Sequence, residues 1–254
     1  AGSSSEYLSH YRSKMMINYS ILLTISLTIL FSFLSAKEKV RETEKFPVPF
    51  LQKVEGWPVE WNPTFKQKEN NRLFQDVRKA LANHLQRVVY ILDKNRVQQL
   101  RKLVIRVDLN HKLGNMQYHP NKAWLINNHH DPSLEKRVHI PRAGQLLSKA
   151  QWAKHPYVIL HELAHSFHDQ VLSFENKEII AAYQRAEKAG LYEKVLLFRG
   201  GKTSHYARTN HKEFFAEMTE SYLGVNDFYP FVRAELQEHD PKTYILLQKI
   251  WGKI

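Results

Sequence analysis

Apolar residues recur at every third or fourth position in several stretches of the chain, and this spacing predicts amphipathic helices. The first such stretch covers 74–92, with apolar residues at positions 74, 77, 81, 85, 88, 89 and 92. A second, short helix is expected at 96–103. After residue 156 the helical pattern continues almost to the end of the chain, and it predicts helices near 156–171, 176–189, 211–223 and 241–251. Asp240 followed by Pro241 is typical of a helix start, and Gly224 of a helix end.

Strand patterns are confined to the first part of the chain. The stretch 103–109 (LVIRVDL) alternates as a strand does, and Arg137–Ile140 (RVHI) is expected to form a short strand that ends at Pro141. Trp57–Trp61 (WPVEW) also alternates, but Pro58 lacks a backbone N–H and places this strand at the edge of a sheet at best. Strand-like pieces are also expected within 117–127. Strands mixed with helices, followed by helices alone, predict an α+β fold.

The uncharged stretch 15–36 follows Arg12 and Lys14 and ends in small residues. This arrangement predicts a secretory signal, and therefore a secreted protein. The alternative is an uncleaved anchor, since the apolar run 17–34 is just long enough to span a bilayer. The expected organisation is an N-terminal extension with the signal (or anchor) at 1–36, a lead-in segment at 37–63 and one catalytic domain at 64–254.

Composition narrows the possible functions. The absence of cysteine excludes a disulfide scaffold, a cysteine-ligated zinc finger, an iron–sulfur cluster and a cysteine nucleophile. The formal net charge of +12 permits binding to anionic polymers. However, the basic residues are scattered and form no arginine-rich run, so no specific nucleic-acid partner is expected.

The stretch HELAH at 161–165 carries the clearest chemical signal. His161 and His165 are four residues apart, so on a helix they share one face and can bind the same zinc ion. Glu162 follows the first histidine and can act as general base toward a water at that metal. The site therefore predicts one Zn²⁺ as the cofactor.

Zinc in a catalytic site needs a third protein ligand. The metzincin continuation is excluded because His168 and Val171 stand where that pattern has Gly and His. A carboxylate from a later helix remains, and Glu213 and Glu217 are four residues apart within the expected helix 211–223. One of the two would bind zinc and the other would accept the N–H of a ligating histidine, while Asp169 competes for that accepting role. The spacing alone does not decide between the two glutamates.

The stretch 206–217 (YARTNHKEFFAE), together with the HExxH helix, resembles the C-terminal catalytic region of the anthrax lethal factor family of gluzincins. The stretch 206–224, together with 226–230 (NDFYP), is also similar to small, uncharacterised secreted bacterial metallopeptidases. The resemblance covers about residues 158–230. It implies a zincin-like metallopeptidase fold, Glu213 as the third zinc ligand, Tyr206 as a catalytic tyrosine and Glu217 outside the ligand set. The large additional domains of the toxin do not fit within this chain, so the toxin's substrate is not implied.

These features predict a secreted zinc metallopeptidase that acts on a peptide or protein substrate. Glu162 would take a proton from the attacking water and pass it to the leaving amine, and Tyr206 would donate to the developing oxyanion. We also expect the strand Arg137–Ile140 to offer an edge that pairs with an extended substrate. A membrane partner is expected only if the N-terminal apolar segment stays uncleaved. The alternative is a catalytically silent zincin-like domain that binds anionic matrix or envelope polymers through its basic surface.

Overall fold

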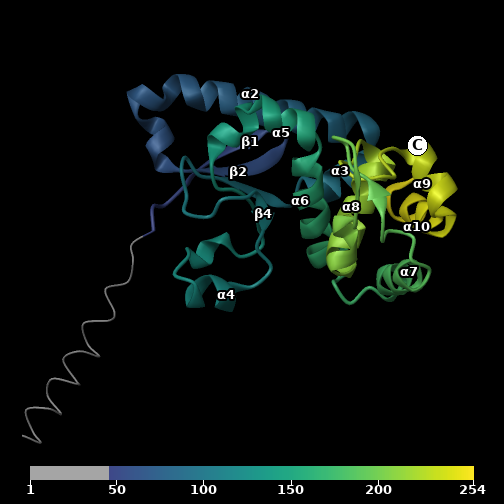
Figure 1. The fold of residues 1–254 in the computed structure, drawn as a ribbon. Helices are drawn as coiled ribbons and strands as arrows, with labels where there is room; N and C mark the ends of the chain where they lie inside the picture. Colours follow the sequence, from purple (N-terminus) through teal and green to yellow (C-terminus); the bar gives the residue numbers. More distant parts are fainter. Residues whose placement is uncertain (1–45) are drawn as a thin grey trace, which may run out of the picture. The chain divides into compact units, whose positions relative to one another are not determined.

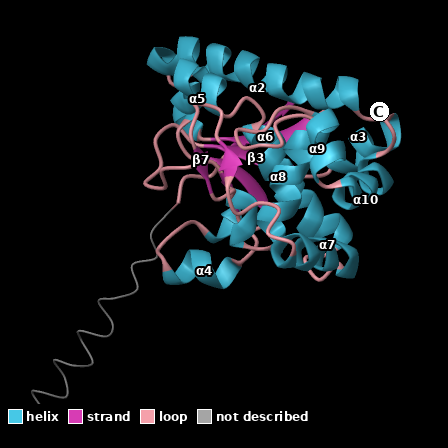
Figure 2. Cartoon of the chain, turned by 45° about the vertical axis from the view of Figure 1, so that its right-hand side comes forward, coloured by secondary structure: helices cyan, strands magenta, loops and turns pink. Residues whose placement is uncertain are grey.

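The computed structural model describes residues 46–254, in which a five-stranded sheet is surrounded by helices (Figures 1 and 2). The strands are β1 (Phe50–Val54), β2 (Trp57–Trp61), β3 (Val104–Val107), β4 (Gln117–Tyr118) and β5 (Arg137–Ile140), and a hairpin is formed by β6 (Val195–Leu196) and β7 (Lys202–Thr203). The helices are α2 (Asn71–Ile91), α3 (Lys94–Leu100), α4 (Lys122–Asn127), α5 (Lys149–Lys154), α6 (Val158–Phe167), α7 (Lys177–Lys188), α8 (His211–Leu223), α9 (Arg233–His239) and α10 (Pro241–Trp251). The expected α+β class is confirmed.

The strand order is β1-β2-β3-β5-β4. The pairs β2–β3 and β3–β5 are parallel, whereas the two outer pairs, β1–β2 and β5–β4, are antiparallel. A buried chain of polar groups joins the central strands: His139 Nε2 lies 2.9 Å from Asp108 Oδ2, and His139 Nδ1 lies 3.1 Å from His119 Nε2. These contacts tie the antiparallel outer strand to the parallel centre of the sheet.

The expectation that Trp57–Trp61 forms an edge strand is wrong, because β2 lies between β1 and β3. Pro58 is tolerated there because its register partner is Lys53 of β1, while pairing with β3 begins only at Val59. A missing N–H at the first residues of a strand removes no bond from the inner ladder. The inward-facing Trp57, Val59 and Trp61 are all fully buried.

The segment 117–127 is also different from the expectation. Only Gln117–Tyr118 forms a strand, and Lys122–Asn127 forms helix α4 instead. The side chain of Asn121 accepts a hydrogen bond from the Trp124 N–H at 2.9 Å, and this cap starts the helix. As a result β4, and not β5, is the outer strand on this side of the sheet.

Helix α2 confirms the predicted periodicity, since Val77, Leu81, Leu85 and Val88 are its buried apolar residues. It runs along one side of the sheet, where it packs against β1 and α6 (Figure 1). The predicted helices near 96–103, 176–189, 211–223 and 241–251 are present as α3, α7, α8 and α10. Asp240 caps α10 as expected, because its carboxylate accepts the Thr243 N–H at 3.1 Å.

Residues from Pro47 to Ile254 form one compact unit. The unit therefore starts before the expected boundary at residue 64, because β1 and β2 belong to the sheet and are not a separate lead-in. The expected signal or anchor at 1–36 lies outside the described residues. Among the helices of residues 46–254, none has the length and apolar character needed to span a membrane.

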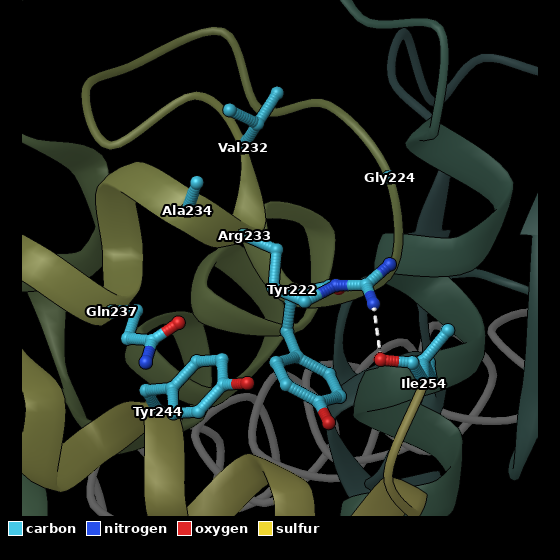
Figure 3. A pocket seen from close by; sticks show the side chains of 8 residues that line it. All are labelled: Tyr222, Gly224, Val232, Arg233, Ala234, Gln237, Tyr244 and Ile254. Atoms are coloured by element: carbon cyan, nitrogen blue, oxygen red, sulfur yellow. Dashed lines mark hydrogen bonds between the residues drawn. The ribbon is translucent and has the colours of Figure 1, made fainter.

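Arg233 of α9 forms hydrogen bonds with Tyr222 of α8 and with Ile254 (Figure 3). Arg233 donates from Nη1 to the Ile254 carbonyl at 2.9 Å and from Nε to the Tyr222 carbonyl at 3.0 Å. Gly224 ends α8 as expected, although its φ of −153° is ordinary extended backbone. Glycine is required there by space, since a Cβ would lie 2.5 Å from ring carbons of Tyr157.

Candidate metal centre

Helices α6 and α8 pack against each other and carry the predicted ligands on their facing sides. All ten residues of α6 are buried, including His161, Glu162 and His165. Helix α8 starts at a cap in which the Asn210 side chain accepts the backbone N–H groups of Lys212 and Glu213 at 2.8 and 3.0 Å. Because the cap fixes the first turn of α8, it also fixes where the Glu213 side chain leaves the helix.

Three ligand atoms converge at this interface. His161 Nε2 and His165 Nε2 lie 3.1 Å apart, and Glu213 Oε2 lies 3.3 Å from the first and 3.1 Å from the second. Zinc ligands at ~2.0–2.1 Å from a tetrahedral ion are separated by roughly 3.3–3.4 Å. The three atoms therefore form a triangle that fits a zinc ion with an open fourth position, and the donor set of two imidazoles and one carboxylate suits that ion.

His155, His161 and Glu220 form a second group with ligand-type spacing. Glu220 is fully buried, and its two oxygens lie 2.7 Å from His161 Nδ1 and 2.7 Å from His155 Nε2. These distances are those of charge-assisted hydrogen bonds and are too short for two ligands of one metal. Burial works against the charge of Glu220, but His155 and His161 together outweigh it and lower the pKa of this carboxyl to about 2.

Glu220 thus takes the role that the sequence assigned to Glu217 or Asp169. When Glu220 accepts the Nδ1–H of His161, the proton is held on that nitrogen and the Nε2 lone pair points toward the metal position. Neither Glu220 nor His155 was predicted as a site residue. Glu220 lies one further turn along the same helix face as Glu213 and Glu217, which was the available signal, whereas nothing in the sequence pointed to His155.

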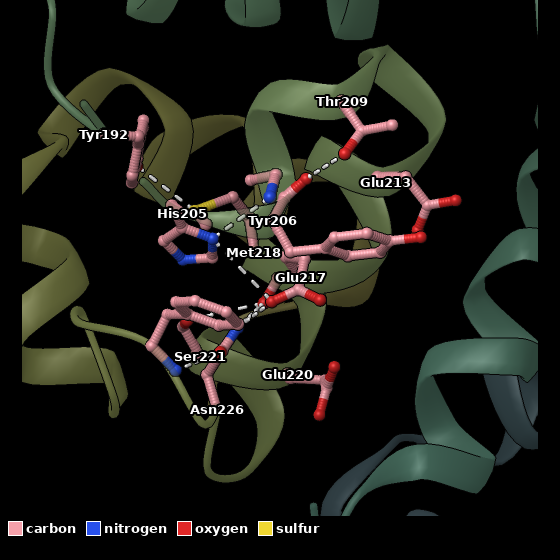
Figure 4. Close-up of polar contacts among 12 residues, drawn as sticks. Tyr192, His205, Tyr206, Thr209, Glu213, Glu217, Met218, Glu220, Ser221 and Asn226 are labelled. Carbon is pink, nitrogen blue, oxygen red and sulfur yellow. Dashed lines mark hydrogen bonds and ion pairs between the residues drawn. The ribbon is translucent and has the colours of Figure 1, made fainter. Parts of the chain in front are cut away.

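Glu217 is buried near Glu220 and His161 but makes no hydrogen bond to His161. Its Oε2 accepts a hydrogen bond from Asn226 Nδ2 at 2.9 Å (Figure 4). Its Oε1 is 3.6 Å from His161 Nδ1, beyond hydrogen-bond distance. Burial, and then the nearby charge of Glu220, raise the pKa of Glu217 to about 8. Asn226 was not predicted as a partner.

Asp169 lies in a different environment. It accepts hydrogen bonds from the Tyr118 hydroxyl at 2.6 Å and from Lys136 Nζ at 2.5 Å. These contacts join the segment after α6 to strand β4 and to the turn before β5. The structure therefore brings Asp169 to the sheet edge and not to a ligating histidine, because the helix widens into a π-turn at His168–Leu172.

Glu162 and Tyr206 line the same cleft as the three ligand atoms. Burial raises the pKa of Glu162, while the charge of His161 opposes this rise. Tyr206 belongs to the short 3-10 helix Tyr206–Thr209 and is 49% exposed, with its phenol directed toward Glu213 (Figure 4). The preceding His205 is buried and caps this turn, since its Nδ1 accepts the Ala207 N–H at 3.1 Å.

The cleft has a volume of about 970 Å³. One wall comes from the segment around β4, and α6 and α8 contribute the three ligand atoms and Glu162. The remaining walls come from the end of α5, the β6–β7 hairpin and Tyr206. In comparisons with known proteins, no family model, no curated protein and no solved structure matches the chain. The likeness of 206–217 to the gluzincins therefore stays a prediction, and the geometry of the cleft is the basis for a function.

Proposed function

We propose that this protein is a zinc-dependent peptide hydrolase of the gluzincin type, with a zincin-like fold. The observation that supports this most directly is the triangle of His161 Nε2, His165 Nε2 and Glu213 Oε2, whose sides are 3.1–3.3 Å, inside an open cleft. A zinc ion held by these atoms would act as a Lewis acid on the scissile carbonyl and the attacking water.

Two side chains of the cleft supply the proton chemistry. Glu162 follows the first ligand on α6 and, as general base, takes a proton from the attacking water and later delivers it to the leaving amine. Burial favours this role because it raises the pKa of Glu162 and makes the carboxylate a better proton acceptor. Tyr206 lines the same cleft and donates its hydroxyl hydrogen to the developing oxyanion.

Strand β4 gives the cleft an edge to which an extended peptide can bind. The expected pairing with Arg137–Ile140 fails, because both sides of β5 are already occupied by β3 and β4. Gln117 and Tyr118 of β4 line the cleft, and one side of this strand has no partner strand in the described sheet. Backbone hydrogen bonds along β4 would hold the scissile bond across the metal position. Export remains part of the proposal and is supported by the sequence 15–36.

The test is hydrolysis of a mixed peptide library by the zinc-loaded protein, compared with its Glu162→Gln variant. We expect the variant to keep stoichiometric zinc and to lose at least ~100-fold in kcat/KM, the scale of a general base. Equal cleavage by both proteins would refute the role of Glu162. Zinc binding without cleavage by either protein would favour the silent domain that binds anionic polymers. Failure to bind zinc would refute the ligand set.

A further inference from the structure

Three basic side chains line the cleft, and each comes from a different element. Lys154 is the last residue of α5, Arg199 lies in the turn between β6 and β7, and Lys212 lies in the first turn of α8. Lys154 and Arg199 are exposed and Lys212 is partly buried. The positive charge of these side chains in the cleft lining therefore comes from three separate parts of the chain.

None of the three takes part in a salt bridge within residues 46–254. Elsewhere in that part of the chain, Arg137, Arg185 and Arg208 each have a carboxylate within 3.1 Å. Lys154 makes no salt bridge in that part of the chain although Asp227 is close enough to feel its charge. Burial raises the pKa of Asp227 and outweighs the opposing effect of Lys154. The cleft cations therefore keep their capacity to bind an anion.

The acidic side chains of the cleft are already engaged or buried. Glu213 belongs to the metal triangle, Glu217 accepts from Asn226, and Asp227 is only 5% exposed. A zinc ion would offset the charge of Glu213. Burial raises the pKa of Glu217 and of Asp227 and so favours their uncharged forms. A substrate that enters from solvent meets the exposed ammonium and guanidinium groups first, where opposite charges attract it.

The basic groups stand beside apolar surface. Lys212 Nζ lies 4.1 Å from the centre of the Phe174 ring, an arrangement that holds the ammonium group in place. Arg199 follows Phe198, which is 41% exposed, and the neighbouring Leu197 forms a bridge with Phe228. A bound side chain would thus find a cation and an apolar contact at the same place.

We propose that the cleft selects peptides with Glu or Asp side chains on the residues that flank the scissile bond. This inference rests on the proposed function, and it assigns the counter-charges to Lys154, Arg199 and Lys212. A peptide fits better than an acidic polysaccharide because the open edge of β4 offers backbone hydrogen bonds to an extended chain.

The test measures binding in the Glu162→Gln background with zinc, so that no turnover is needed. Three decapeptides differ only at the two residues around the central bond, which are both Glu, both Gln or both Lys. We expect the Glu peptide to bind about three- to fivefold more tightly than the Gln peptide for each charge contact, with less difference at high salt. The Lys peptide should bind most weakly.

The single variants Lys154→Gln, Arg199→Gln and Lys212→Gln, made in the same background, should each reduce the preference for Glu over Gln. The exposed Lys242 on α10 lies outside the cleft, so Lys242→Gln is the matched control and should leave the preference unchanged. Thermal unfolding of each variant separates lost binding from lost folding.

Equal binding of the Glu and Gln peptides, or an equal loss in Lys242→Gln, overturns the inference. A preference that persists when the two Glu residues are moved to the peptide's end also overturns it, because binding then follows net charge alone. Cleavage by the parent protein is recorded separately. A charge preference without cleavage would support the assignment of Lys154, Arg199 and Lys212 as counter-charges but refute the proposed function. Cleavage without a charge preference would support the proposed function and overturn the inference.

Discussion

The contact between Glu220 and His161 leads to a prediction that tests which glutamate of α8 orients His161, Glu220 or Glu217. The variant Glu220→Gln keeps the size of the side chain but removes its charge. In the parent protein both carboxylate oxygens accept hydrogen bonds at 2.7 Å, one from His161 Nδ1 and one from His155 Nε2. An amide has only one acceptor oxygen, so its NH₂ group must face one of the two imidazole nitrogens as a donor.

The expected loss is in zinc affinity. If the amide oxygen faces His161, a charge-assisted bond becomes a neutral one of about half its strength. If the amide NH₂ faces His161, the imidazole must move its proton to Nε2 and can no longer bind the metal through that atom. Changes of this kind next to a metal ligand cost about 10–100-fold in metal affinity, or roughly 1.4–2.8 kcal/mol. We expect a loss in that range, with the fold preserved.

The assay is competition for zinc against a chelator of known affinity, with circular dichroism as a check on folding. The matched control is Glu217→Gln, since Glu217 lies on the same helix but is 3.6 Å from His161 Nδ1. Its zinc affinity should change by less than about threefold, well below the range for a directly bonded partner. An unchanged affinity in Glu220→Gln, or a larger loss in Glu217→Gln, would refute the assignment of Glu220.

Three further predictions concern the tyrosine, the buried histidines and the end of α8. Tyr206→Phe should lower kcat about 10²–10³-fold, the scale of one oxyanion donor, with little change in zinc affinity, as measured by steady-state kinetics and the same zinc competition. Burial lowers the pKa of His119 and of His168 to about 3 from 6.5, so between these values the unfolded chain binds protons that the folded chain does not. The contribution of these histidines to the free energy of unfolding is therefore fully present above pH ~6.5 and falls as the pH drops, by about 1.4 kcal/mol per pH unit for each such histidine. Urea unfolding at pH 7 and pH 5 should show a smaller decrease in the free energy of unfolding for His168→Phe than for the parent. An equal decrease would contradict this. Gly224→Ala should destabilise the fold by about 1–3 kcal/mol, seen as a lower Tm, because its Cβ would lie 2.5 Å from the Tyr157 ring; an unchanged Tm would show that this contact relaxes freely.

Most helices could be predicted from the sequence because their signals are local. The buried residues of α2 recur at the helical period, and the caps of α8 and α10 come from side chains next to the helix start. Helix α4 was missed because its sequence, KAWLIN, also fits a short strand and is too short for its period to be read. The side chain of Asn121 decides the outcome there, through a single hydrogen bond.

The order of the strands could not be predicted in the same way. Strand β5 was identified at its correct residues, yet its place inside the sheet depends on β4, which is only two residues long. Strand β2 was placed at an edge because of Pro58, although the register leaves that residue outside the pairing with β3. Pairing is a property of segments far apart in the chain, and this is why the edge that faces the cleft was assigned to β5 instead of β4.

The three glutamates of α8 also show that local signals can be predicted from the sequence while contacts between distant segments cannot. Their spacing of four and three residues puts Glu213, Glu217 and Glu220 on one helix face, so periodicity gives all three equal access to the neighbouring helix α6. Their roles are separated by groups from elsewhere in the chain: His155 precedes α6 and holds Glu220, and Asn226 follows α8 and holds Glu217. Only Glu213 is left to face both ligating histidines. A helix pattern can therefore name the candidates for a metal site, but their partners in the fold decide which carboxylate faces both histidines and which one bonds to the other nitrogen of His161.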